Sequence, residues 1–245
     1  MVLGDNTGTC ASVNLSEMPG FPTTRLSLVL AVAAEPDAQY GEALGALCEI
    51  YWQPLYAFIR RRGYGHEAAQ DLTQSFIARL LEKKVLREFR QERGRFRSFL
   101  LASLKNFLAN ERDAEQAQKR GGAAQQVPIS QIELLDDTSP DAIFEKQWAV
   151  ALVNRVFSQL QEEFRREGKA DRFGRLSVGL TGDESRVRYR EIARQLGMSE
   201  GAVRVAIHRL RRRFHEALRD EISMTVTEER EISEEIRHLL SALQG

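Results

Sequence analysis

The segment from Tyr189 to Phe214 constrains the fold of this chain more tightly than any other stretch. Ile192 and Leu196 lie four residues apart, which predicts one apolar face of a short helix. Gly197 supplies the permissive backbone that commonly ends a helix. Ser199 can then cap a second helix, because its hydroxyl accepts a hydrogen bond from a free backbone N–H. The segment therefore predicts two helices joined by a tight turn.

The second of these helices has two chemically different faces. Ala202 and Ala206 lie on its inward face, and their small side chains would let the two helices cross closely. The outer face and the C-terminal end carry the basic residues Arg204, His208, Arg209, Arg211, Arg212 and Arg213. A short helix, a glycine-containing turn and an arginine-rich second helix are typical of a DNA-binding helix-turn-helix. The alternative is an ordinary helical hairpin with a solvated basic face.

Charge is distributed unevenly along a chain whose formal net charge is zero. Residues 186–219 carry ten Arg and three Glu, a net charge of +7, and residues 86–120 carry nine basic and five acidic residues, a net charge of +4. Residues 123–147 sum to −4, and residues 220–245 sum to −5. Local patches attract a phosphate backbone, so the two basic blocks indicate nucleic-acid binding despite the neutral total.

Apolar residues recur at three- and four-residue spacing along most of the chain, and the alternation typical of strands is nearly absent. This periodicity predicts an all-α fold. Besides the helix-turn-helix, the expected helices cover residues 41–62, 66–84 and 95–118, a long segment from about residue 140, a short one at 173–180, and a tail from Thr227. The acidic stretch that begins at Gly121 and Gly122 is punctuated by glycine and proline and is expected to be a linker.

The domain organisation follows from these boundaries. We predict a flexible arm at 1–23, a first helical domain at 24–120, a linker at 121–142, a second helical domain at 143–222 and an amphipathic tail helix at 223–245. The apolar run that follows Arg25 resembles part of a secretory signal, but it starts late and is shorter than the roughly 20 residues that cross a bilayer. We favour a first core helix that starts at Thr23 or Thr24.

Composition argues against an enzyme and against a metal site. Cys10 and Cys48 are the two cysteines, and their separation matches neither a disulfide framework nor a zinc motif. The four histidines are scattered, and the sequence has no glycine-rich phosphate loop after a strand and no nucleophile motif. We therefore expect no catalytic residue, no metal and no cofactor, and we expect a reducing compartment.

Three blocks in one order carry a resemblance to a known family. They are YWQPLYAFIRRRGYGHEAAQDLTQSFIARLL, RGRFRSFLLASLKNFLANERD and, after the linker, YREIARQLGMSEGAVRVAIHRLRRRF. Over roughly residues 24–120 and 143–222, the chain resembles the extracytoplasmic-function class of bacterial sigma factors. The resemblance implies a promoter-specificity subunit of RNA polymerase with two helical domains and no catalysis of its own.

The resemblance also implies two DNA-binding sites. The helix Glu200–Arg213 would enter the major groove of the −35 element, where arginine contacts to guanine edges discriminate by about 1–3 kcal/mol each. The implied −35 residues are Ser199, Glu200, Arg204, His208, Arg209, Arg211, Arg212 and Arg213, of which the last three are expected at phosphates. The helix around Asn106 would hold the melted −10 element on aromatic, amide and basic groups. Its implied residues are Arg95, Arg97, Lys105, Asn106, Phe107, Asn110 and Arg112.

A third implied site binds RNA polymerase itself. The helix around Asp71 would dock on the clamp helices of the largest polymerase subunit, and the flap region would be a second contact. The residues expected on this site are Asp71, Gln74, Ser75 and Arg79. Where the family commonly has acids, this chain has Gln70 and Ser75. We therefore hypothesise that phosphorylation of Thr73 or Ser75 restores negative charge, about −1.5 to −2 for each site; the alternative is that both are ordinary surface residues.

Other functional interpretations follow from the same residues. A stand-alone helix-turn-helix repressor or activator is the main alternative, although it needs no second aromatic and basic patch. The acidic residues 220–245 could shield the arginine-rich helix, or they could form a structural C-terminal helix. The expected partners are core polymerase and promoter DNA, with an anti-sigma factor or a regulatory kinase as further candidates. We expect a cytoplasmic protein with no membrane partner.

Overall fold

The computed structural model describes residues 38–81, 95–120, 139–181, 188–223, 225–226 and 229–244. All regular structure in these residues is helical, which confirms the predicted all-α class. The elements are α2 (Ala38–Arg61), α3 (His66–Leu81), α5 (Phe96–Arg120), α6 (Pro140–Arg166), α7 (Ala170–Leu176), the 3₁₀ helix η3 (Ser177–Thr181), α8 (Tyr189–Leu196), α9 (Glu200–Ser223) and α10 (Glu229–Gln244). The predicted arm, the helix from Thr23 or Thr24 and most of the predicted linker lie outside these residues.

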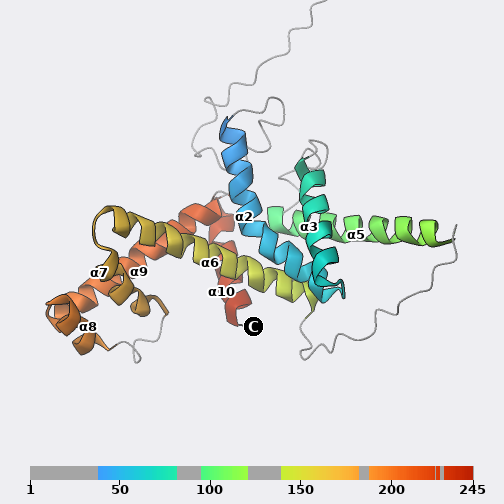
Figure 1. Cartoon of the computed structure of the whole chain (residues 1–245). Coiled ribbons are helices and arrows are strands. Elements are labelled where there is room, and N and C mark those ends of the chain that lie inside the picture. Colours follow the sequence, from blue (N-terminus) through green and yellow to red (C-terminus); the bar gives the residue numbers. More distant parts are fainter. Residues whose placement is uncertain are drawn as a thin grey trace, which may run out of the picture.

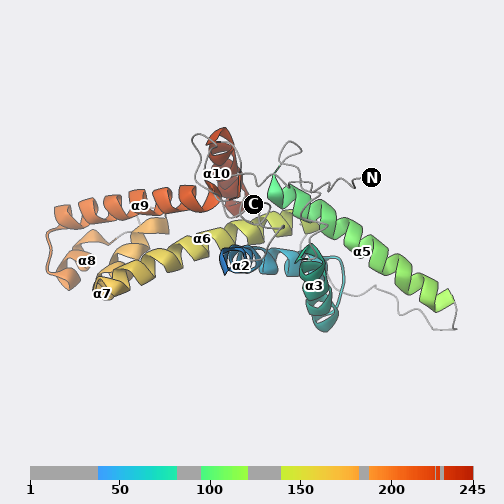
Figure 2. The same ribbon diagram turned by 90° about the horizontal axis from the view of Figure 1, so that it is seen from above.

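The long helix α6 is the element around which the others are arranged. It begins where the sequence predicts: the backbone N–H of Ala142 donates to the Ser139 hydroxyl at 3.1 Å, and Pro140 occupies the first turn. Helices α2, α9 and α10 all contact α6. In both views the free end of α5 projects from one end of the molecule, while α7 and α8 lie at the other (Figures 1 and 2).

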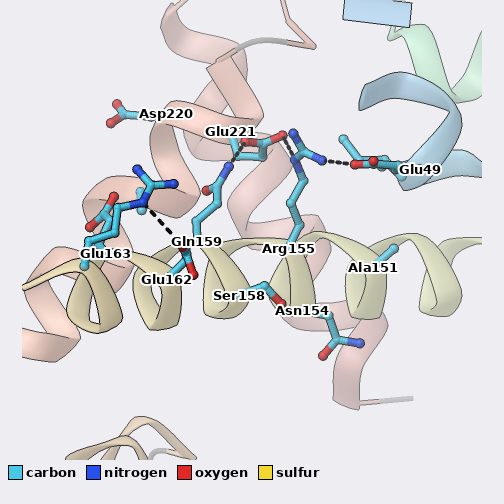
Figure 3. Close-up of a pocket in the computed structure, with 13 residues that line it drawn as sticks. Glu49, Ala151, Asn154, Arg155, Ser158, Gln159, Glu162, Glu163, Asp220 and Glu221 are labelled. Carbon is cyan, nitrogen blue, oxygen red and sulfur yellow. Dashed lines mark hydrogen bonds and ion pairs between the residues drawn. The ribbon is translucent and has the colours of Figure 1, made fainter. Parts of the chain in front are cut away.

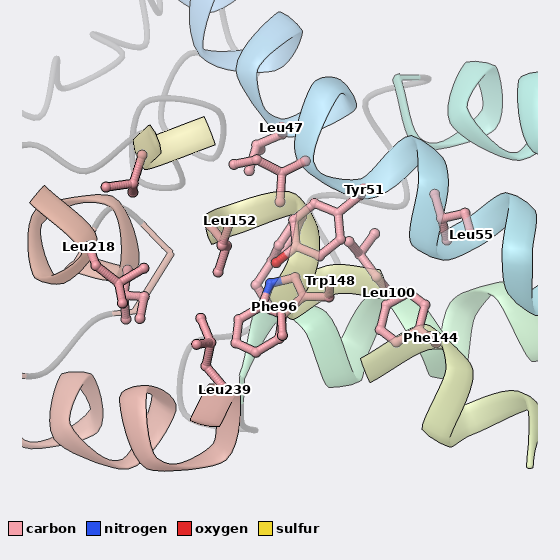
Figure 4. Packing of buried hydrophobic residues seen from close by; sticks show 14 of the residues in the cluster. Leu47, Tyr51, Leu55, Phe96, Leu100, Phe144, Trp148, Leu152, Leu218 and Leu239 are labelled. Carbon is pink, nitrogen blue, oxygen red and sulfur yellow. The ribbon is translucent and has the colours of Figure 1, made fainter. Parts of the chain in front are cut away.

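One hydrophobic core joins the two predicted domains. Trp148 and Leu152 of α6 are fully buried, and Tyr51 and Leu55 of α2 are almost fully buried in the same cluster. Figure 4 shows Tyr51 beside Trp148, with α5 and α10 contributing Phe96 and Leu239 from other sides. The domain boundaries stay a prediction, and α2 from the first predicted domain packs directly against α6 from the second.

A charged cavity of about 1090 Å³ lies where α2, α6 and α9 meet. Arg155 of α6 crosses it and forms ion pairs with Glu49 of α2 at 2.6 Å and with Glu221 of α9 at 2.7 Å (Figure 3). Glu221 is buried and also accepts a hydrogen bond from Gln159. The sequence did not predict this network of charges. Its ion pairs connect α2, α6 and α9 at a polar edge of the core.

Candidate nucleic-acid interface

Helices α8 and α9 form the predicted turn with the predicted caps. Gly197 ends α8 in the left-handed conformation, with φ of 63°, and its N–H donates to the Ala193 carbonyl. The Ser199 hydroxyl then accepts a hydrogen bond from the N–H of Ala202 at 3.1 Å, at the start of α9. Both features restrict the angle between the helices, because they fix the backbone on each side of the turn.

The inner face of α9 is held by a close contact with η3. Ile207 is buried, and a Cβ atom placed on Gly179 would come within 2.6 Å of its Cγ2 atom. Arg211, half-buried, donates from Nε to the Gly179 carbonyl at 2.7 Å. The backbone of η3 therefore lies directly against the inner face of α9. This contact positions α9 so that its opposite face is exposed to solvent.

The exposed face of α9 carries a compact set of basic side chains. Arg204, His208, Arg209 and Arg212 are all exposed. The guanidinium of Arg204 stacks over the Tyr189 ring of α8, with 4.1 Å between its Cζ atom and the ring centre. Of the predicted −35 residues, these four therefore lie together on one accessible face.

Two other predicted −35 arginines make contacts inside the protein. Arg211 is bonded to η3 as described above. Arg213 forms an ion pair with Glu163 of α6 at 2.6 Å and lies over the Phe164 ring. We expected both side chains at DNA phosphates, but in this structure they attach α9 to its neighbours. At the start of α9, Glu200 is exposed and lies 3.9 Å from Arg190.

The predicted −10 helix α5 presents amide groups around a small hollow. Asn106 and Asn110 are exposed and line a cavity of about 120 Å³ between α5 and α3, together with Arg79 and Ser103. Phe107 forms its floor: this ring is buried, lies 5.5 Å from the Phe76 ring, measured between centroids, and has the Arg79 guanidinium over it. The volume is several times the roughly 30 Å³ that one water occupies in the liquid.

The structure corrects several of the predicted −10 contacts. Phe107 is 5% exposed and Arg97 is 4% exposed, so neither side chain is accessible to DNA in this arrangement. The ammonium group of Lys105 pairs with Asp141 of α6 at 2.6 Å, and Arg95 is engaged by α10. Asn106, Asn110 and Arg112 remain exposed, as expected for residues that contact DNA.

One part of the chain matches the model of a known family. Residues 185–214 match the family model of sigma-70, region 4. The matched segment contains α8, the turn and most of the basic part of α9. This region 4 match agrees with the sequence resemblance for that segment; the extracytoplasmic-function class and the assignment of residues 24–120 stay predictions. A search of curated proteins and a search of solved structures returned no match.

The predicted polymerase-binding face lies on the exposed side of α3. Asp71, Gln74, Ser75 and Arg79 are all exposed there. Thr73 is different: its side chain is fully buried, and its hydroxyl donates to the Ala69 carbonyl at 2.6 Å. A buried hydroxyl committed to its own helix cannot be reached by a kinase, so phosphorylation at Thr73 is ruled out for the folded protein, whereas Ser75 stays a candidate.

A charged network under α10 has no signature in the sequence. Arg97 donates to Glu235 of α10, with 2.9 Å between Nε and the nearest carboxylate oxygen, and to Glu145 of α6. His238 lies 2.9 Å from the same Glu145 carboxylate. Burial lowers the pKa of Arg97, but the hydrogen bond and charge of Glu235 outweigh it and raise the pKa, so this guanidinium stays charged.

The C-terminal segment forms the predicted amphipathic helix and packs on the body of the protein. Ile232 and Leu239 of α10 are buried in the common core. Its carboxylates pair with α5 and with Arg219 near the end of α9, while Arg204 and Arg209 stay exposed. The tail therefore does not shield the basic face that matches region 4. None of the described helices has the length and apolar character needed to cross a membrane.

Proposed function

We propose that this protein is an RNA polymerase sigma factor of the extracytoplasmic-function class, which directs core polymerase to specific promoters. The observation that supports this most strongly is the region 4 match at residues 185–214, which coincides with a capped helix-turn-helix. Its exposed face bears Arg204, His208 and Arg209. A second amide-lined surface on α5 favours a sigma factor over a protein that only binds duplex DNA.

For the −35 element, the proposed reader is the N-terminal half of α9 in the major groove. Arg204 and Arg209 can donate two hydrogen bonds to a guanine edge, which discriminates by about 1–3 kcal/mol for each contact. Arg212 is exposed at the C-terminal side and suits a phosphate, because backbone contacts position the helix without reading sequence. Ser199 and Glu200 at the start of α9 complete the proposed contact set.

For the −10 element, the proposed capture site is the hollow beside Asn106. An unpaired base must leave the stack to be held, and amide groups can bond its Watson–Crick edge. Asn106 and Asn110 offer these amides on the rim, and Arg112 lies exposed on the same helix, where it can meet a phosphate. The buried Phe107 ring supports the hollow from below, so we assign it a supporting role and not a DNA contact.

The proposed protein partner is the core polymerase, through the exposed face of α3. Asp71, Gln74 and Ser75 are exposed there, and their polar side chains suit a contact that forms and dissociates. We place this contact on the clamp helices of the largest subunit, with the flap region as the partner of the C-terminal half. A cytoplasmic location, and regulation by an anti-sigma factor or by a kinase at Ser75, belong to the same proposal.

The discriminating experiment compares DNA binding with and without core polymerase. A library of genomic fragments is incubated with the protein alone, with bacterial core polymerase alone, and with both. A sigma factor should select fragments only with polymerase present, and Asp71→Ala with Gln74→Ala should weaken that selection. Selection of duplex fragments by the protein alone, unaffected by these changes, would favour the stand-alone regulator and contradict the proposal.

A further inference from the structure

Helix α10 lies against the start of α5, and its carboxylates occupy both arginines there. Glu235 of α10 contacts Arg95 Nε at 2.6 Å and Arg97 Nε at 2.9 Å with its two oxygens. Glu234 adds a 2.7 Å contact to Arg95. These are charge-assisted contacts of the kind that a phosphate also makes with arginine. The C-terminal helix thus fills, in the free protein, positions that a nucleic-acid backbone could fill.

The contact is buried and specific, unlike a surface ion pair. Arg97 and Glu235 are 4% and 2% exposed, and the Arg97 guanidinium also lies 4.9 Å from the centre of the Trp148 ring. Glu145 of α6 and His238 of α10 complete the cluster. All three guanidinium nitrogens of Arg97 therefore donate hydrogen bonds to carboxylates while α10 is in place. Arg97 can contact solvent only when α10 moves.

The connection between α9 and α10 is short, so α10 would stay close to Arg95 and Arg97 even if a nucleic-acid backbone replaced its carboxylates there. Only residues 224–228 separate Ser223, the end of α9, from Glu229, the start of α10. A short tether gives the displaced helix a high effective concentration at its own site, so a competitor must be strong or must be supported by other contacts. Leu240 and Leu243 of α10 are exposed, so part of this helix is not committed to the core.

We propose that α10 is an autoinhibitory segment, which competes with the melted promoter strand for Arg95 and Arg97. This inference rests on the proposed function, because it places a strand phosphate at these arginines on the helix that carries Asn106. When Glu234 and Glu235 withdraw, Arg95 loses both of its carboxylate partners on α10, and Arg97 loses Glu235 while it keeps Glu145 of α6. Both guanidiniums can then meet a phosphate at the start of the helix that carries the exposed Asn106, Asn110 and Arg112. Strand binding and α10 docking therefore oppose each other, and the coupling is reciprocal.

The first test measures binding of fluorescein-labelled single-stranded 20-mers of random sequence to the full-length protein. The variant Glu234→Gln/Glu235→Gln is compared with Glu67→Gln/Asp220→Asn, which removes the same charge from exposed positions outside α5 and α10. The first variant should gain about tenfold in affinity, the gain expected if the site is open in about a tenth of the molecules. Its salt dependence should steepen by about 1.4 in the log–log slope, for two added phosphate contacts at about 0.7 each. Equal affinities and slopes in the two variants would overturn the proposal.

The second test uses the unmodified protein, so it stands even if the buried pair is needed for folding. Hydrogen exchange of the α10 amides is followed with and without the same oligonucleotides at saturating concentration. Competition requires α10 to exchange faster when DNA is bound, while α6 stays protected. Unchanged or slower exchange in α10 would show that the helix is a fixed part of the fold.

Transcription assays separate this inference from the proposed function. If Glu234→Gln/Glu235→Gln and the parent protein give the same polymerase-dependent transcription and the same strand binding, the autoinhibitory role fails and the sigma-factor proposal stands. If neither protein supports transcription with core polymerase from any promoter in a library, the sigma-factor proposal fails, and the inference fails with it.

Discussion

The guanidinium of Arg204 lies over the Tyr189 ring, with 4.1 Å between its Cζ atom and the ring centre. Tyr189 is the first residue of α8 and is buried, whereas Arg204 is exposed on the outer face of α9. A cation held over an aromatic face has fewer rotamers to lose on binding DNA. The first helix of the motif thus orients a basic side chain of the second.

Removing the ring should therefore weaken DNA binding without removing any charge. Tyr189→Leu should reduce affinity for a −35 site about two- to fivefold, because an exposed cation–π contact contributes about 0.5–1 kcal/mol. Tyr189→Phe keeps the ring and should bind like the parent protein. Fluorescence anisotropy with the polymerase complex measures both; equal losses in the two variants would implicate the hydroxyl and contradict this account.

Asn106→Ala should slow promoter opening more than it weakens the closed complex. The side chain is exposed on the rim of the α5 hollow, so its loss removes contacts to an unpaired base and leaves the core intact. We expect opening to fall about tenfold, the effect of losing roughly 1.4 kcal/mol, which lies within the 0.5–1.5 kcal/mol that one hydrogen bond contributes net. Gln116→Ala, exposed farther along α5, is the matched control. Permanganate reactivity of unpaired thymines reports opening, and equal effects of the two changes would refute the assignment.

The support that η3 gives to α9 predicts opposite effects at two glycines. Gly179→Ala places a methyl group 2.6 Å from Ile207 Cγ2, and the stiff branched side chain of a buried isoleucine cannot move away easily. The expected loss in the free energy of unfolding is about 1–3 kcal/mol, as for other overpacked cores. Gly174→Ala meets no atom within 4 Å inside helix α7 and should stabilise by about 0.5–1 kcal/mol. Urea denaturation measures both, and a neutral Gly179→Ala would contradict the close contact.

Cys48 should be a slow nucleophile. Burial raises the pKa of its thiol, and the charge of the neighbouring Glu49 raises it further, so less reactive thiolate is present at any pH below that pKa. At pH 8, iodoacetamide should label Cys48 severalfold more slowly in the folded protein than in urea. The labelling rate of Cys48 should keep rising to a higher pH than the labelling rate of glutathione does, because the pKa of the Cys48 thiol is raised. Labelling of the Cys48 peptide by mass spectrometry checks this, and equal rates in the two states would rule out the burial effect.

Local sequence signals predicted the helices and the motif well. Gly197 and Ser199 determine the backbone conformation of the turn through local interactions alone. Both have their expected roles, Gly197 at the end of α8 and Ser199 at the start of α9. Helix α6 starts at Pro140, which agrees with the predicted start near residue 140. Pro54 is of a residue type that commonly kinks or breaks a helix, yet α2 continues through it. Burial of Tyr51 before Pro54 and of Leu55 after it holds this turn in the core and offsets the lost hydrogen bond.

Contacts between distant segments could not be predicted in the same way. Periodicity shows that α10 has an apolar face but not which helix covers it, so the pairing of Glu235 with Arg97 has no signature in the sequence. For the same reason, Arg97 and Phe107 were assigned to DNA when their positions in three dimensions are internal. Thr73 was likewise predicted as a phosphorylation site although it is buried, because its burial depends on packing partners outside α3.

The central claim is that the exposed face of α9 reads promoters for core polymerase. Transcription from a promoter library, with core polymerase and either the parent protein or Arg204→Glu, tests it most directly. We predict a set of promoters that requires the parent protein and shares a −35 sequence, and loss of that sequence dependence in Arg204→Glu. An unchanged promoter profile in Arg204→Glu, or no protein-dependent transcription at all, would contradict the account.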